Sequence, residues 1–596
     1  MKYLFQSIPP NTYFTLCDKR NQDLHHLVKD NLCGGPSIIF HRHHEKEQTK
    51  IREADYKDQA ELCKGILGLD ANGLYLMAMM DDMPTGWYVR RQNQLQPGQD
   101  AEDCTANFKP ETSHKYSRAA MEWMEWVMHE DGLQIRHEFN GKEKRLGRRQ
   151  LPVDGWCQAT QTVYQFHGCW WHGHTCHLNR KDFNDIRQKS KEDLRAETAE
   201  NTAYLEGLGY TVVEMWECQW QQQKSHDKNL QRFIATRFRR HMDKKQHMTQ
   251  EDILEAVVAG TLFGLVECDI HVPEALHPHF AEMQPIFKNV NITRDDIGET
   301  MRAYAEQHKI MSQPRRSLIG SFKGEKILLA TPLLQWYLDH GLVVTHVYQV
   351  IQYWPDNCFR KFGKEVSDAR RAGDKDPDQA IIADTMKLLG TCLFVFSFSL
   401  GIYFQSLILF LCLSAGNSSY GKTITNKERH RDVKYCNDEE ASSLINDPHF
   451  RTLTPLDDNI YEVEMSKKTI KLDLPLHIGF FVYQYAKKRM LEFYFDFLDV
   501  FVDRRHFQLC EMDTDSYYMA LAARTLDEVV KPEKRRQFYE AWPKWFPAQA
   551  CDEHHADFVD VKCRGEQWTP TQDCCLKRQQ FDKRTPGLFK VEWQGK

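Results

Sequence analysis

The chain lacks several features that would place it quickly in a functional class. It has no excess of positive charge: its 596 residues carry a net charge of −6, and its pI is about 6.5. A uniformly basic nucleic-acid-binding protein is therefore excluded, although a cleft can be basic locally while the whole chain is mildly acidic. The sequence also has no internal repeat and no low-complexity linker. Its start, residues 1–14, lacks the apolar core of a signal peptide.

The cysteines lack the dense spacing of a secreted disulfide framework. There are 18, scattered along the chain and often close to histidines. This distribution favours a reducing compartment and at least one metal site. The length predicts several domains with ample core.

Charge is missing from one long segment, Thr391–Leu413, which is about 23 residues of apolar and small polar side chains. Such a run is long enough to span a bilayer. Taken alone, it would indicate a membrane protein, but its position within a motif described below favours another interpretation.

Two carboxylates stand one residue apart in Glu511–Ser516, which reads EMDTDS and leads into an apolar run. The pattern predicts a strand, a turn and a second strand, with Asp513 and Asp515 on one face of an extended segment. Such a pair can hold divalent metals, and two metals roughly 3.5–4 Å apart can clamp the attacking and leaving oxygens of a phosphoryl transfer. The pair also fits ordinary turn chemistry at a surface hairpin.

A second motif, Ile66–Leu76, reads ILGLDANGLYL: an apolar strand ending at Asp70, a turn, then Leu74 and Tyr75. It resembles the first catalytic motif of family B DNA polymerases, an Asp followed by a Ser/Asn-Leu-Tyr turn. The resemblance implies that Asp70 binds both metals. It also implies that Tyr75 stacks under the incoming sugar and excludes the ribose 2′-OH. From the residues alone, the alternative is a strand-end Asp that caps a turn.

The apolar run interrupts a third motif. Asn417–Lys422, NSSYGK, resembles the core of the fingers motif of the same family, Lys-x-x-x-Asn-Ser-x-Tyr-Gly. Removing Thr391–Gly416 would join Gly390 to Asn417 and restore the motif with Lys387 in register. We therefore interpret the run as a translated intron or a mispredicted exon. The alternatives are a buried helix and a membrane anchor, and an anchor would force a polymerase fingers element into lipid.

The restored fingers motif predicts a nucleotide-binding helix face. Helical spacing would align its polar residues along one side. The lysine could neutralise the incoming triphosphate while the tyrosine packs on the nascent base pair. The predicted nucleotide-binding residues are Tyr75, Lys387, Asn417, Tyr420 and Gly421.

The three motifs follow one another in the order found in the family. The segment Gly479–Asp499 has apolar residues at helical spacing and predicts a long palm helix. Its cations at 487–489 could face template phosphate or form a solvated helix face. Residues Gly34–Arg42 and Gly260–Ile270 resemble the protein-primed branch of Polinton-like mobile elements. In that branch, a protein hydroxyl starts synthesis.

Two parts of the family pattern have no counterpart here. Fewer than 70 residues precede Asp70, too few for a proofreading exonuclease. No Lys-x-Tyr motif, which holds the primer in the family, follows the Asp pair. We therefore expect a family fragment that is truncated at both ends.

A second motif cluster lies between the polymerase-like motifs. Residues 163–176 read VYQFHGCWWHGHTC, and residues 209–220 read GYTVVEMWECQW. Four side chains offer N/S ligands suited to a tetrahedral structural Zn²⁺; these are Cys169, His174, Cys176 and Cys218. A looser group predicts a less regular second zinc site or ordinary thiols and histidines; it contains Cys551, His554, His555, Cys563, Cys574 and Cys575.

The segment Arg145–Trp220 closely resembles the very-short-patch-repair endonucleases, whose fold belongs to the restriction-endonuclease group. The resemblance implies that Asp154 is the metal-binding catalytic carboxylate and that His167 and His172 are active-site histidines. It assigns the four N/S ligands to structural zinc and Trp171 to DNA contact. Two positions depart from the pattern: Phe166 stands where the family has Thr, and Gln165 where related nucleases often carry a carboxylate. The alternative is a zinc-stapled DNA-binding fold without catalysis.

The predicted fold class is α+β, a right-hand polymerase palm and fingers with an inserted restriction-endonuclease-like α/β domain that zinc staples. We expect 1–100 to hold the palm part with the first motif, 101–225 the endonuclease-like insertion, 226–380 a palm/fingers connection, 381–430 the interrupted fingers motif, and 431–596 the palm with the Asp pair and the start of a thumb.

The predicted function is DNA-directed DNA polymerisation of the protein-primed family B type, in mobile-element or viral-type replication. Asp70 and Asp513 would ligate two Mg²⁺ ions, with Asp515 beside them. The expected partners are template and primer DNA, dNTPs and a terminal priming protein. We expect an intracellular, nuclear protein without genuine membrane association, although no convincing basic import signal is present. The alternatives are a Mg²⁺-dependent DNA endonuclease acting through the embedded domain and an inactive mobile-element relic that binds DNA.

Overall fold

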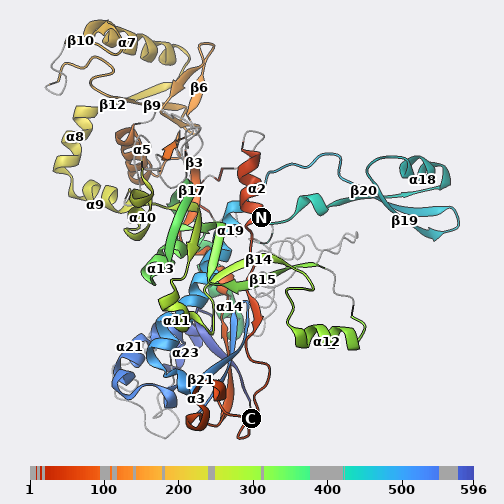
Figure 1. Cartoon of the computed structure of the whole chain (residues 1–596). Helices are drawn as coiled ribbons and strands as arrows, with labels where there is room; N and C mark the ends of the chain where they lie inside the picture. Colours follow the sequence, from red (N-terminus) through yellow and green to blue (C-terminus); the bar gives the residue numbers. More distant parts are fainter. Residues whose placement is uncertain are drawn as a thin grey trace, which may run out of the picture.

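The computed structural model describes residues 8–9, 12, 14–15, 21–93, 108–110, 117–138, 143–176, 182–238, 248–310, 314–375, 421, 423–548 and 575–595. These residues form a mixed α/β structure (Figure 1). Its body contains two five-stranded sheets, and a separate four-stranded sheet belongs to the inserted segment. Lys387, Asn417, Tyr420 and the run Thr391–Gly416 lie outside the described residues, as does the loose Cys/His group except for Cys575.

The first sheet joins strands from the two ends of the chain. Its order is β1 (Ser37–Ile39), β21 (Phe507–Asp513), β22 (Ser516–Leu521), β2 (Gly65–Ala71) and β23 (Phe589–Gly595). All neighbouring strands are antiparallel. The predicted strand–turn–strand around the Asp pair is confirmed, as is the strand that carries Asp70.

The second sheet lies beside the long central helix. Its order is β16 (Lys323–Ala330), β13 (Gly264–His271), β17 (Val343–Asp356), β3 (Met83–Asn93) and β4 (Phe108–Pro110). The helices α10 (Gln250–Val258) and α13 (Thr331–Asp339) pack against each other next to it. Residues Leu265, Val350 and Ile351 at its centre are fully buried, so this sheet contributes to the core.

The central helix runs through the middle of the body. The predicted helix over Gly479–Asp499 is confirmed: α19 (Leu476–Leu491) continues into a π-helical segment, η6 (Glu492–Leu498), and then α20 (Asp499–Phe501). Gly479 permits a close approach, because a Cβ there would lie 2.1 Å from Ile424 Cγ2. The first turn of α19 can therefore pack directly against the segment around Ile424.

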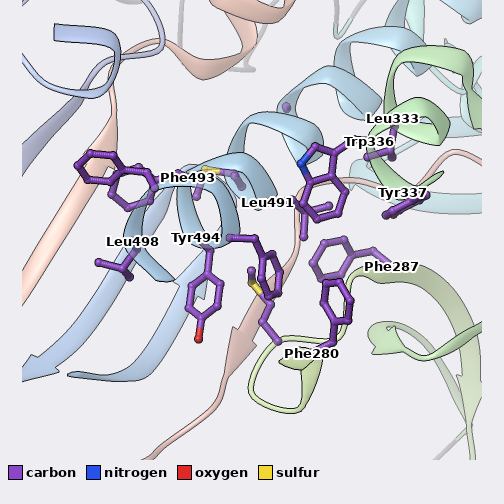
Figure 2. Packing of buried hydrophobic residues seen from close by; sticks show 14 of the residues in the cluster. Phe280, Phe287, Leu333, Trp336, Tyr337, Leu491, Phe493, Tyr494 and Leu498 are labelled. Atoms are coloured by element: carbon purple, nitrogen blue, oxygen red, sulfur yellow. The ribbon is translucent and has the colours of Figure 1, made fainter. Parts of the chain in front are cut away.

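An aromatic core surrounds this helix (Figure 2). Phe493 stacks on Phe589 of β23 at a centroid distance of 3.8 Å. The Tyr494 ring meets Phe495 edge-on, and Phe495 in turn meets Phe280. Burying each such ring contributes roughly 1.5–3 kcal/mol, so this cluster ties the helix to the first sheet.

The cations at 487–489, expected to face template phosphate or to form a solvated helix face, instead contact protein groups. Lys487 is only 3% exposed, and Lys488 pairs with Glu492 one turn later. The Arg489 guanidinium donates to the carbonyl of Gly587 at 2.8 Å and lies over the Trp545 ring at 4.0 Å. The helix is enclosed by neighbours, so these side chains bind protein groups.

The inserted segment forms a unit of its own, in the upper left of Figure 1. Its sheet has the order β12 (Thr211–Trp216), β9 (Thr162–His167), β8 (Gly155–Cys157) and β5 (Arg136–His137), with β12 parallel to β9. The described part of this unit also contains the helices α5 (Arg118–Asp131), α7 (Lys191–Gly207), α8 (Glu217–His226) and α9 (Lys228–Arg237). Short strand pairs are β6 (Lys144–Leu146) with β7 (Leu151–Val153), and β10 (Phe183–Asn184) with β11 (Lys189–Ser190).

Local signals begin the long helix of this unit. Ser190 and Asp193 form a capping box at the start of α7, with each side chain bonded to the other's backbone N–H. Such a box satisfies helix N–H groups that would otherwise have no partner. Leu194 and Leu205 of α7 are buried, and Leu205 packs with Val163 of β9, so α7 covers one face of this sheet.

The remaining elements form projections and a cover. The three-stranded lobe β18 (Arg431–Cys436), β20 (Ile460–Ser466) and β19 (Phe450–Asp457) carries α18 (Asp438–Ile445) and extends from the body (Figure 1). A hairpin of β14 (Ile286–Ile292) and β15 (Arg315–Ser321) is linked through α12 (Glu299–Gln307). Other helices are α2 (Gln22–Asp30), α3 (Glu53–Tyr56), α4 (Leu74–Met79), α11 (His277–Phe280), α14 (Arg360–Lys375), α21 (Arg535–Trp545) and α23 (Cys575–Asp582). Within the described segments, no helix combines the length and apolar character needed to cross a membrane.

Candidate active sites

Acidic side chains from two distant segments meet at one end of the first sheet. Asp70 of β2 and Asp513 of β21 both pair with Ser516 of β22. Because neighbouring strands lie about 4.8 Å apart, the two Asp Cα atoms are roughly 10 Å apart. Laterally paired residues share a face of a sheet, so both carboxylates belong to one face.

Asp515 lies in the turn between these strands, close to the end of β2. Its carbonyl accepts a hydrogen bond from the Ala71 N–H at 2.7 Å. Burial raises the pKa of Asp515 to about 6, and the negative charges of Asp70 and, less strongly, Asp513 act in the same direction. The charges of both Asp70 and Asp513 act on Asp515, so the three carboxylates form one acidic cluster, with Asp513 on its exposed side.

The turn is held by the glycine-rich segment before β1. Thr514 has a φ of 55°, a strained conformation for a β-branched residue, and its N–H donates to the Pro36 carbonyl at 2.7 Å. A Cβ at Gly35 would lie 2.7 Å from Thr514 Cγ2. Gly35 thus lets the two backbones approach and fixes the turn that carries Asp515.

Basic side chains near Asp70 partly balance this negative charge. Lys590 of β23 pairs with Asp70 in register, and its Nζ lies 2.9 Å from Asp70 Oδ2. Arg370 of α14 lies close enough for its guanidinium to interact with Asp70, although burial and then Arg584 lower its pKa. No sequence motif contains Lys590 or Arg370, so motif reading missed both.

Two of the predicted nucleotide-binding residues lie in described segments. Tyr75 is half-buried on α4, the helix directly after Asp70, and meets Tyr483 edge-on at a centroid distance of 5.8 Å. The carbonyl of Gly421 accepts a hydrogen bond from Thr425 Oγ1 at 3.1 Å. Of these two residues, Tyr75 is close in sequence to a residue of the acidic cluster, Asp70, and Gly421 is not.

The inserted unit brings the four predicted N/S ligands together. One ligand atom from each of Cys169, His174, Cys176 and Cys218 lies within 4.8 Å of the others. His174 Nδ1 is 3.7 Å from Cys169 Sγ and 3.5 Å from Cys218 Sγ. A tetrahedral Zn²⁺ with bonds of about 2.3 Å to sulfur and 2.0 Å to nitrogen separates such ligands by about 3.6 Å, so the geometry fits. Burial raises the pKa of the Cys169 thiol to about 12.

Asp154 and the two predicted histidines lie next to this cluster. Asp154 Oδ2 accepts a hydrogen bond from the Phe166 N–H at 2.8 Å, and burial raises the Asp154 pKa to about 6. The rings of His167 and His172 are 4.7 Å apart. Burial lowers the pKa of His172 to about 4, and the neighbouring His167 adds to this effect. The Trp171 side chain is 45% exposed.

Sequence reasoning missed a carboxylate in this second site. Glu214 of β12 pairs laterally with Gln165 of β9. Its Oε1 lies 2.7 Å from His167 Nε2 and accepts a hydrogen bond from Thr202 Oγ1 at 2.7 Å. The alternation of polar and apolar residues along this segment predicts only that Glu214 lies on an exposed face of a strand. The pairing of β12 with β9 is needed to show which residues lie next to it.

Comparison with known proteins gives two partial similarities, and no model of a known protein family matches the chain. The type II nicking enzyme V.NmeAIP of Neisseria meningitidis (serogroup A / serotype 4A) is 35% identical over 66 residues, covering 10% of this chain and 44% of the nicking enzyme. The phi29 DNA polymerase complexed with primer-template DNA aligns with a TM-score of 0.31 and 8% identity, over 89% of this chain and 47% of the polymerase chain. The chain thus spans less than half the length of either protein.

Proposed function

We propose that this chain is a DNA-directed DNA polymerase of the family B, protein-primed type, which adds dNTPs to a primer on template DNA. The observation that carries the proposal is the convergence of Asp70, Asp513 and Asp515 at one end of the first sheet. Tyr75 follows on the helix directly after Asp70, which agrees with a nucleotide site there. Replication of a mobile element or viral-type DNA with a terminal priming protein is the finer form of this proposal.

The acidic cluster fits divalent cations. Burial raises the pKa of the half-buried Asp515, and the negative charges of Asp70, Asp513 and Glu592 act in the same direction. Two bound Mg²⁺ ions would neutralise this charge and stabilise the attacking and leaving oxygens. Asp70, Asp513 and Asp515 would hold them, with Asp513 at the exposed side.

In the proposed reaction, the primer O3′ forms a bond to the α-phosphorus of the dNTP. The bond from that phosphorus to the bridging oxygen breaks, pyrophosphate leaves, and the 3′-OH proton passes to solvent. The protein's part is positioning and electrostatic stabilisation. Lys590 and Arg370 would limit the repulsion between Asp70 and the triphosphate, and Lys387 would bind the departing pyrophosphate.

The test is primer extension with Mg²⁺ by a chain from which residues 391–416 have been deleted. Asp515→Asn and Asp70→Asn should each reduce nucleotide addition by at least about 10³-fold, because each removes a metal-holding carboxylate. Asp513→Asn should also reduce nucleotide addition.

Glu528→Gln provides the control, since Glu528 is an exposed acid that follows Leu521, the end of β22 opposite to Ser516. It should extend primers at the rate of the parent chain. Extension by Asp515→Asn at the parent rate would refute the metal assignment.

A second function is favoured by the inserted unit: Mg²⁺-dependent nicking of duplex DNA. We infer it from Asp154, His167 and His172, which lie together beside the four N/S ligands, and from the 35% identity to a nicking enzyme. Asp154 would hold the metal. A water oxygen would bond to the phosphorus as the P–O3′ bond breaks, and the water's proton would pass through solvent to the leaving O3′. Loss of nicking in Asp154→Ala tests this function.

A further inference from the structure

The endonuclease-like site contains a histidine with two distinguishable ring nitrogens. His167 is 4% exposed. Its Nε2 lies 2.7 Å from Glu214 Oε1, whereas its Nδ1 is buried and has no hydrogen-bond partner among the described residues. A buried polar atom without a partner is uncommon and indicates either a functional role or a bound group.

The contact with Glu214 determines where the ring proton lies. An ionised carboxylate only accepts hydrogen bonds, so Nε2 must carry the proton. Nδ1 of a neutral ring then has a free lone pair. The Glu214 contact therefore leaves Nδ1 as an acceptor for a hydrogen-bond donor within the site.

Glu214 is itself held in place. Its Oε1 accepts from Thr202 Oγ1 of α7 at 2.7 Å, and Thr198, one turn earlier, contacts His172 Nδ1 at 3.1 Å. The two threonines thus connect one helix to both halves of the site. Contacts of this kind, one layer out from a site histidine, fix the orientation of its ring.

The position of Glu214 also accounts for the glutamine on β9. Gln165 and Glu214 are laterally paired on parallel strands, so their side chains leave the same face of the sheet. A carboxylate missing from Gln165 is present one strand away. Glu214 therefore places a carboxylate on the face of the sheet that carries Gln165 and His167.

We propose that Glu214 is a positioning residue of the endonuclease-like site, which fixes the orientation and proton location of His167. The inference rests on the proposed nicking function. His167 Nδ1 accepts a hydrogen bond from the attacking water, and Glu214 acts only through His167.

The test is single-turnover nicking of supercoiled plasmid by the full chain with Mg²⁺. Glu214→Gln keeps the size of the side chain but removes its charge. Either the amide oxygen or the amide NH₂ can then face His167 Nε2, so the ring proton is no longer fixed there. The substitution should slow nicking about 10- to 100-fold, the usual effect of losing an orienting partner, with the DNA dissociation constant unchanged. Glu214→Asp should recover part of the rate.

A double-mutant cycle separates this role from a structural one. In a His167→Ala background, Glu214→Gln should cause no further loss, because the residue through which it acts is gone. Glu200→Gln is the matched control, since Glu200 is an exposed acid on α7 that pairs with Arg149 at 2.9 Å. It should nick at the wild-type rate.

Two negative results have different meanings. If the wild type nicks and Glu214→Gln nicks equally fast, the role of Glu214 alone is overturned. The same holds if Glu214→Gln lowers the rate by the same factor in the His167→Ala background as in the wild type. Wild type that binds plasmid but never nicks would overturn the nicking function and this role with it.

Discussion

His477 illustrates how one buried side chain sets the pH response of the fold. It lies in the first turn of α19, 5% exposed, with its ring stacked on Tyr353 at a centroid distance of 5.3 Å. Its Nε2 has no partner in the described part of the chain. Burial lowers the pKa of His477 to about 4 from an ordinary value of 6.5, and a hydrogen bond to the Pro84 backbone opposes this only in part.

The sign of the effect follows from the direction of this shift. Between pH 6.5 and about 4 the unfolded chain binds a proton at His477 and the folded chain does not, so acidification favours unfolding. The full effect is about 3 kcal/mol. We expect His477→Phe, which keeps the stacked ring and cannot titrate, to flatten the fall in unfolding free energy from pH 7 to pH 4 by about that amount. Denaturant titration at several pH values measures it.

The exposed His226 provides the control for this measurement. His226→Gln should leave the pH dependence of the unfolding free energy unchanged. A wild-type pH dependence in His477→Phe would show that burial of this ring costs less than the structure implies.

At the level of residues, the sequence predicted those that stand inside motifs. That Asp70, Asp513 and Asp515 lie close together could be predicted because strand and turn signals surround each of them. The places of Glu214, Lys590 and Arg370 beside the candidate sites could not be predicted, because they depend on contacts between segments far apart in sequence. Asp70 and Lys590 lie side by side on neighbouring strands, and the residue pattern of neither strand indicates this pairing.

At the level of elements, the four predicted zinc ligands come from two places, the loop 168–176 and the helix α8. Cys169, His174 and Cys176 lie in the loop, and Cys218 lies at the start of α8. A metal there would join the end of β9 to α8.

We expect the purified chain to contain Zn²⁺, and removal of it by a chelator to lower the thermal stability of the inserted unit. Structural zinc supplies folding free energy directly, so stripping should leave this unit molten. Cys218→Ser should reproduce the stripped state without chelator. Elemental analysis, near-UV circular dichroism and limited proteolysis within residues 118–238 would measure these effects.

The buried Cys436, in the separate β18–β20 lobe, gives a matched thiol control. Cys436→Ser should retain the zinc content and the chelator response of the parent chain. An inserted unit that stays protected from protease after complete metal removal would contradict the structural role of zinc.

Local pattern predicted several elements well. The strand–turn–strand at the Asp pair and the helix over Gly479–Asp499 both carry strong periodicity. The π-helical segment η6 was not predicted, since seven residues inside a continuous helix are too few for an apolar pattern to show a change of helical period. The enclosure of Lys487–Arg489 was also missed, because only tertiary packing shows that neighbours cover that side of the helix.

At the level of the whole molecule, the order of motifs predicted a unit nested between two polymerase-like segments. Where that unit attaches could not be predicted. Trp354 of β17 joins the buried cluster of the inserted unit and meets Phe238 edge-on at 5.1 Å. A strand of the body therefore supplies part of the inserted unit's core, which connects the two candidate sites through one packed framework.

Together, the two proposed activities predict an order of reactions on DNA to which no terminal priming protein has been added, since hydrolysis that releases O3′ creates a 3′-OH that nucleotide addition can use in place of a protein hydroxyl. On unprimed, closed-circular duplex, the chain without residues 391–416 should first open the circle and then incorporate labelled dNTP. Asp154→Ala should do neither, but should incorporate dNTP on a circle that was nicked beforehand. Asp515→Asn should open circles at the parent rate and incorporate nothing. Gel mobility and retained label report the two steps separately. Incorporation by Asp154→Ala on unnicked circles would mean that the inserted site does not supply the primer end.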